Sequence, residues 1–88
     1  TRKARAAEAT NAIGAILTAE AIYYQENGFF GNEVDLLVDL NEVNFLYTVT
    51  PDASVNTVVV ATSNSATTTG IVVTGTLLQN GTRTITSN

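Results

Sequence analysis

The sequence contains no Cys, His, Met or Trp, and it has a single Pro. Without Cys the chain forms no disulfide, and without Cys or His it lacks the usual ligands of a zinc site. The same absences remove the thiolate nucleophile and the imidazole general base. Because no nucleophile, base and orienting group occur together, the sequence argues against an enzyme, and no cofactor is expected.

Charge is also scarce. Four Lys and Arg residues stand against eight Asp and Glu residues, which gives a formal net charge of -4. Phosphate binding relies on clustered Lys and Arg, so nucleic acid is not an expected partner. The sequence has no run of about 18 apolar residues, which is the length needed to span a bilayer. A chain of 88 residues forms one domain, residues 1–88, whose small core is marginal unless partner subunits support it.

The few charges are unevenly placed. Residues 1–43 hold ten of the twelve, and residues 44–88 hold only Asp52 and Arg83. Threonine runs the other way, with three in the first stretch and twelve in the second. The chain therefore has a charged half and a hydroxyl-rich half.

Residues 2–27 are predicted to form one helix, because Ala is abundant and Pro is absent there. At 100° per residue one broad apolar face forms. Its members are Ala9, Ile13, Ile16, Leu17, Tyr23 and Tyr24. Asn27-Gly28 is a favourable stop, since Gly accepts the left-handed conformation that ends many helices. The apolar face requires a partner surface within the domain.

The charges of this helix are reversed relative to its dipole. Arg2, Lys3 and Arg5 occupy the first turns, where acidic residues are favoured, while Glu20 and Glu26 lie toward the other end. This pattern indicates that a preceding segment of the same helix has been removed. The alternative is an ordinary helix end that tolerates the charges at about a few tenths of a kcal/mol each.

The second half predicts a sheet. A connection over residues 28–43 includes a short helical turn within Val34–Leu40, and alternation with a period of two begins at Asn44. The predicted strands cover residues 44–50, 54–62, 70–78 and 82–86, and the predicted turns are Pro51-Asp52, residues 63–69 and Gln79-Asn80-Gly81. Short turns between sequential strands give an antiparallel sheet. The predicted fold is α+β, with one long N-terminal helix packed on a four-stranded antiparallel sheet.

One stretch within the helix and one across its end resemble a known family. Residues 5–16 are similar to the second half of the long helix of type IV pilins and pseudopilins, and residues 24–30 follow that family's aromatic, x, x, Asn-Gly, aromatic ending. The resemblance is specific over about the first 30 residues and architectural beyond them. It identifies the chain as similar to the globular part of a major pilin.

This resemblance implies a structural subunit of a type IV pilus, which polymerises into a cell-surface filament for adhesion, motility or related functions. The implied partners are other copies of the chain and the pilus assembly machinery. The implied location is an extracellular filament, anchored in the inner membrane before assembly through an apolar half-helix that precedes Thr1. A pseudopilin of a secretion or DNA-uptake system is one alternative, and a small secreted binding module unrelated to pili is another.

The chain departs from the family pattern at two points. Gly31 stands where many members have Pro, and the carboxy-terminal disulfide loop of many pilins is excluded because there is no Cys. The second departure leaves the far edge of the sheet held by packing and hydrogen bonds alone.

Glu20 is the first candidate site residue, because it lies near the centre of the apolar face. A buried carboxylate requires partners. We expect Glu20 either to accept hydrogen bonds from Tyr side chains, loop amides or Arg83, or to be solvated at the rim of a narrower face. A thermal midpoint lowered by Glu20→Gln favours the first alternative.

The other candidates are charges and aromatic rings. In a filament, the basic collar is expected to face acidic loop residues of a neighbouring subunit, although exposed pairs contribute only about 0 to 1 kcal/mol. Those subunit-interface candidates are Arg2, Lys3, Arg5, Glu33, Asp35 and Asp39. The acids match no EF-hand spacing, so a solvated acidic loop is expected rather than a metal site. Tyr23, Tyr24, Phe29 and Phe30 are expected to organise the core between helix and sheet.

Overall fold

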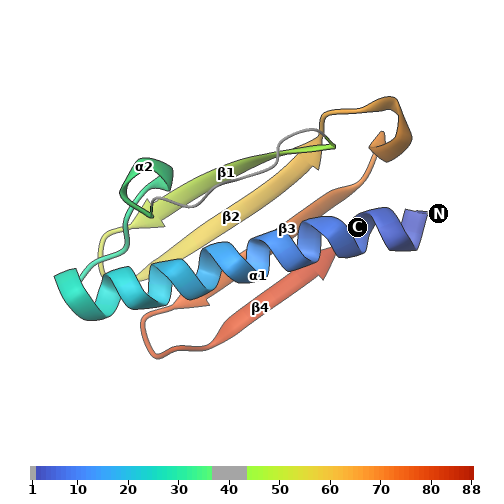
Figure 1. Ribbon diagram of the computed structural model, residues 1–88. Coiled ribbons are helices and arrows are strands. Elements are labelled where there is room, and N and C mark those ends of the chain that lie inside the picture. The colour runs from blue at the N-terminus through green and yellow to red at the C-terminus, as the bar shows by residue number, and fades with distance from the viewer. Residues whose placement is uncertain (1, 37–43) are drawn as a thin grey trace.

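A computed structural model describes residues 2–36 and 44–88. The helix α1 (Arg2–Asn27) lies across one face of a four-stranded antiparallel sheet, as Figure 1 shows. The predicted α+β fold is thereby confirmed. Figure 1 also shows the N-terminus at one end of α1 and the short helix α2 (Glu33–Leu36) near the other.

Helix α1 packs on the sheet through its apolar face. Ala9, Ile13, Ile16 and Leu17 are buried on successive turns, whereas residues such as Asn11 on the opposite side are exposed. Burial of such side chains contributes about 25 cal/mol for each Å² of apolar surface removed from water. The tertiary contact, more than helix propensity, therefore holds α1 in place.

The end of α1 follows the sequence prediction. Gly28 adopts a positive φ of 79°, and its N–H donates to the carbonyl of Tyr24 at 2.7 Å. This is the left-handed position that Gly occupies without steric penalty. The chain then leaves the helix and turns toward the sheet.

The strands are β1 (Phe45–Asp52), β2 (Asn56–Ser63), β3 (Val72–Leu78) and β4 (Arg83–Ser87), and they lie in that order. A short 3-10 helix, η1 (Ala66–Thr68), lies between β2 and β3. Strands β1 and β4 are the two edges. Because the sheet is a simple meander, each strand pairs with its neighbours in sequence.

Alternation along the strands produces the core. Phe45 and Tyr47 of β1 point to the buried side, and Leu46 and Thr48 are exposed, as the period of two requires. The buried apolar residues contributed by the sheet side are Phe45, Tyr47, Val59, Ala61, Ile71, Val73 and Leu77. They meet the apolar face of α1.

Helix and sheet approach most closely at Gly75, in the middle of β3. A Cβ atom at Gly75 would lie 2.3 Å from Cγ2 of Ile13 and 3.3 Å from Cδ1 of Leu17. Gly75 pairs with Val59 on one side and with Ile85 on the other. The missing side chain thus creates the space that Ile13 fills.

One predicted turn is wrong. Pro51 and Asp52 belong to β1, paired with Thr57 and Asn56, and the chain reverses at residues 53–55 instead. Proline is tolerated because β1 is an edge strand. Ala53 makes the reversal with a positive φ of 46°, a conformation for which Ala gives no sequence signal.

The other connections agree with the sequence prediction more closely. The Gly81 N–H donates to the carbonyl of Leu78 at 3.0 Å, and Gly81 has a φ of 92°, which confirms the predicted turn at residues 79–81. Strands β2, β3 and β4 begin later than predicted, at Asn56, Val72 and Arg83. Turn geometry occupies residues 53–55, 69–70 and 79–80, so each of these strands begins only after its turn.

The predicted helical turn in the connection is present as α2. The backbone N–H of Asn32 donates to the Asp35 carboxylate, and the N–H of Asp35 donates to Oδ1 of Asn32, both at 3.1 Å. This reciprocal pair satisfies two donors that the start of a helix leaves without partners. Residues beyond Leu36 in the predicted turn, including Asp39, lie outside the described residues.

Candidate functional site

Glu20 connects helix α1, the segment that follows it and the sheet. Its side chain has no exposed surface, and its carboxylate accepts two hydrogen bonds. The backbone N–H of Gly31 donates to Oε1 at 2.8 Å, and the hydroxyl of Thr57 donates to Oε2 at 2.5 Å. Helix α1, the connection after it and strand β2 therefore meet at one carboxylate.

Burial sets the electrostatics of this junction. Removal of the Glu20 carboxylate from water raises its pKa above the usual 4.5. The hydrogen bonds from Thr57 and Gly31 oppose this rise, and the nearby Asp35 carboxylate adds to it. Desolvation is the largest of these effects, so the folded protein favours the protonated form of Glu20 more than the unfolded chain does.

The sequence left two alternatives for Glu20, a buried carboxylate with hydrogen-bond partners and a solvated carboxylate at the rim of the face. The structure shows the buried carboxylate. A loop amide is among its partners, but Arg83 is not: the guanidinium donates instead to the carbonyl of Gly14 at 3.4 Å and to Oγ1 of Thr18 at 3.2 Å. Sequence reasoning missed Thr57. The available signal was its place two residues before Val59, on the inward side of β2.

Gly31 fits this junction for two reasons. It supplies the N–H that Glu20 accepts, a donor that Pro lacks. A Cβ atom at Gly31 would also lie 2.9 Å from Cβ of Asp35 and 2.9 Å from Cε1 of Tyr23. The departure from the pilin-like Pro therefore coincides with a contact that Pro cannot make.

The four aromatic candidates divide into an inner pair that packs on the core and an outer pair. Tyr24 and Phe30 stack with centroids 4.7 Å apart, and Phe30 is buried. Tyr23 and Phe29 meet edge to face at 5.8 Å, but Phe29 is 47 % exposed. The expectation that Phe29 helps to organise the core is therefore wrong: the sharp turn at Gly28 directs Phe30 inward and leaves Phe29 outside.

A second polar junction lies toward the other end of α1. The Asn44 amide donates to both oxygens of the Glu8 carboxylate, at 3.1 and 3.2 Å. The Asn44 carbonyl accepts from the Asn64 N–H and from the buried hydroxyl of Thr68, each at 2.8 Å. No sequence pattern links residues 8, 44 and 68, so this junction could not be predicted from the sequence.

Among the charged candidates whose side chains the structure describes, Arg5 lies apart from Glu33 and Asp35. Arg5 is exposed near the N-terminal end of α1 and is close to Arg2 and Lys3 in sequence. Glu33 and Asp35 are exposed on α2, near the C-terminal end of α1. Figure 1 shows these two ends of the molecule, which extends 39 Å along its longest axis. Contact between the basic and acidic groups therefore requires a second molecule.

The side of α1 opposite its buried face carries a row of exposed residues, most of which have small side chains; the Oγ1 atom of Thr18, at the margin of the row, accepts from Arg83 of β4. Ala7, Asn11, Ala15 and Thr18 are exposed and follow one another at spacings of four, four and three residues. Ile22 continues the row and is 54 % exposed. Positions at these spacings lie along one face of a helix. We call these five residues the outer row of α1.

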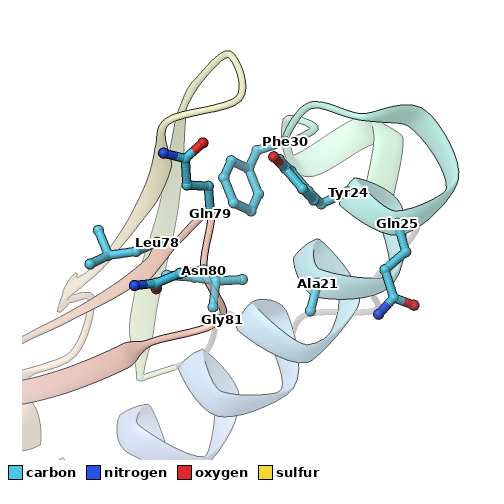
Figure 2. A pocket seen from close by; sticks show the side chains of 9 residues that line it. Ala21, Tyr24, Gln25, Phe30, Leu78, Gln79, Asn80 and Gly81 are labelled. Carbon is cyan, nitrogen blue, oxygen red and sulfur yellow. The ribbon is translucent and has the colours of Figure 1, made fainter.

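A shallow pocket of about 260 Å³ lies between α1 and the turn that joins β3 to β4. Figure 2 shows Tyr24 and Phe30 at one side of it, with Gln79 and Asn80 at the other. The full lining consists of Ala21, Tyr24, Gln25, Phe30, Leu77, Leu78, Gln79, Asn80 and Gly81. Its walls combine aromatic rings with side-chain amides.

Comparison of the chain with protein-family models, curated proteins and solved structures gives no match. Within residues 2–36 and 44–88, no cluster of three or more acidic, His or Cys residues is placed to hold a metal ion. No helix in the same described ranges is long and apolar enough to cross a membrane.

Proposed function

We propose that this chain is the globular part of a structural subunit of a type IV pilus, which polymerises into a filament on the cell surface. The observation that carries the proposal is the division of α1 into two faces. One face is committed to the sheet, and the outer row presents small side chains to whatever lies outside the subunit. The resemblance of residues 5–16 and 24–30 to pilins supports the same assignment.

The outer row favours close approach of a second helix. Helices pack with axes about 8–10 Å apart, and the smaller distances need small residues at the contact. Ala7 and Ala15 meet that requirement without removing any side chain from the core of the domain. Repeated contacts of this kind arrange many copies around a central bundle of helices.

Charge supports a head-to-tail arrangement of the copies. The collar of Arg2, Lys3 and Arg5 belongs to one end of the molecule, and Glu33 and Asp35 belong to the other. A contact between unlike ends leaves a free end of each kind, so it generates a filament rather than a closed pair. Each exposed ion pair adds only about 0 to 1 kcal/mol, so these charges set orientation more than affinity.

The proposal includes location and partners. Before assembly the subunit is held at the inner membrane, and the pilus assembly machinery transfers it to the growing filament. Adhesion and twitching motility are the processes that such filaments serve.

The test is electron microscopy of cells labelled with an antibody raised against the 88-residue chain. We expect labelled surface fibres that disappear when the gene is deleted and return with its expression. Label restricted to short periplasmic structures together with loss of protein secretion or DNA uptake supports a pseudopilin instead. Release of the chain as a soluble protein, with no labelled assembly, contradicts both and favours a secreted binding module.

A further inference from the structure

Strand β4 presents an unpaired edge. Among the described residues no strand lies beyond it, and four of its five residues are exposed. Sheet edges are commonly protected from pairing by Pro, by a bulge or by an outward charge. Strand β4 has neither Pro nor a bulge in its pairing, and its single charge, Arg83, is directed to Gly14 and Thr18 of α1.

The hydrogen bonds at both ends of β4 show which backbone groups face outward. The Leu78 N–H donates to the Thr82 carbonyl, and the Asn88 N–H donates to the Val72 carbonyl. In an antiparallel ladder every second residue bonds the same neighbour. The backbone N–H and C=O groups of Thr84 and Thr86 therefore face β3. Those of Arg83, Ile85 and Ser87 face the open edge.

We propose that this edge binds the same edge of a second copy of the chain, as an antiparallel pair with its two-fold axis at Ile85. In that register Ile85 faces Ile85 of the partner subunit, and Arg83 faces Ser87 of the partner subunit. Three facing pairs with two hydrogen bonds each use all the outward groups, which gives six bonds. No other two-fold register pairs all three outward residues.

The side chains are compatible with this register. Arg83 lies opposite a neutral Ser87 rather than a second Arg83, so like charges do not meet. On the face away from the helix, Thr84 lies opposite Thr86 of the partner subunit, and Thr–Thr pairs are favourable across strands. The surface is self-complementary, as an isologous interface requires.

The two helices do not collide. Helix α1 crosses chiefly over β3, where Ile13 occupies the space above Gly75. Joining two β4 edges places the β3 strands three strand spacings apart, about 14 Å. That distance exceeds the 8–10 Å between packed helices. The Ile85 side chains and the Arg83 stems occupy the space between them.

This contact is separate from the proposed filament contact. The two subunits that it joins have their α1 helices in opposite directions. A filament in which all the helices run in the same direction therefore cannot contain this contact. It joins free subunits, or subunits of two oppositely directed filaments. The failure of either proposal leaves the other in place.

Sedimentation equilibrium of the 88-residue chain tests the pairing. Because a five-residue strand buries little surface, we expect the mass to double only as the concentration rises toward about 1 mM. Ser87→Pro removes an outward N–H that β3 does not use, so the concentration needed for dimerisation should rise at least tenfold while the thermal midpoint is kept. A monomer at every concentration, or a dimer unaffected by Ser87→Pro, overturns the proposal.

Single cysteines locate the axis, since the chain contains no other Cys. Facing Cα atoms in a bonded pair are about 5.5 Å apart, within reach of a disulfide. Ile85→Cys should therefore crosslink readily on mild oxidation. In the matched control Thr84→Cys, the two positions are offset along the strands to more than about 7 Å and should crosslink at least tenfold more slowly. Equal rates overturn the register.

Discussion

The carboxylate of Glu20 is the residue whose chemistry depends most on the fold. It is held between Gly31 and Thr57, yet burial still raises its pKa. For an acid whose pKa is higher in the folded state than in the unfolded chain, the folded protein binds more protons. The contribution of Glu20 to stability is therefore fully present below about pH 4.5 and is lost as the pH rises through the folded pKa.

Glu20→Gln tests this sign. The amide oxygen still accepts from Gly31, and the side chain stays neutral at every pH. The thermal midpoint of the variant, relative to that of the wild type, should rise as the pH increases above about 4.5 and level off once the pH exceeds the folded pKa of Glu20. Glu26→Gln, an exposed change of the same kind on the same helix, is the matched control. A deficit of Glu20→Gln that does not change with pH contradicts the dominance of desolvation and agrees with the sequence-based expectation of a lower midpoint.

At this scale the sequence predicted residue types better than partners. The apolar face of α1 placed Glu20 in the core, because helical periodicity depends only on local spacing. Its hydroxyl partner lies 37 positions away in sequence. Such a pairing depends on how helix and sheet dock, which no local pattern contains. The inward turn of Phe30 and outward turn of Phe29 likewise depend on the single conformation of Gly28.

At the scale of elements, packing of α1 on the sheet depends on the missing side chain of Gly75. Gly75→Ala forces a Cβ atom into the position of Ile13 Cγ2, only 2.3 Å away. Overpacking of this kind lowers the free energy of unfolding by about 1–3 kcal/mol. Thermal or denaturant unfolding measures the loss, which corresponds to about 4–8 °C in the midpoint for each kcal/mol.

Two further variants identify the cause. In the background of Ile13→Ala, the loss caused by Gly75→Ala should shrink, since the colliding methyl group is gone. Gly14→Ala should raise stability by about 0.5–1 kcal/mol, because its new Cβ meets no atom within 4 Å apart from its chain neighbours and the nearby backbone of the same helix. Additive losses at residues 13 and 75 contradict a direct collision.

The elements themselves were predictable to different degrees. Helix α1 and the turn at residues 79–81 carry strong local signals, and both are present. The end of β1 was misplaced because Pro51 usually marks a turn, and only its position at a sheet edge makes it acceptable in a strand. Which strand forms the edge of the sheet depends on the tertiary fold, so the local sequence around Pro51 could not predict it.

At the scale of the whole molecule, the charged half and the hydroxyl-rich half have distinct places. Arg5, Glu33 and Asp35 lie toward the two ends of the long axis, and Thr48, Thr50 and their neighbours cover the far side of the sheet. This arrangement suits a subunit that meets its neighbours through α1 and its two ends while the sheet faces solvent. The sequence predicted the two halves, but their arrangement along one axis required the fold.

The central claim is that the outer row of α1 is the face that joins subunits, and Ala15→Arg tests it most directly. Ala15 is exposed, so the substitution should change the stability of the isolated domain by less than about 0.5 kcal/mol. Thr48→Arg, on the opposite face of the molecule, is the control. Filament yield measured by electron microscopy should fall by at least tenfold for Ala15→Arg and remain unchanged for Thr48→Arg. Normal filaments from a stably folded Ala15→Arg subunit would contradict the account.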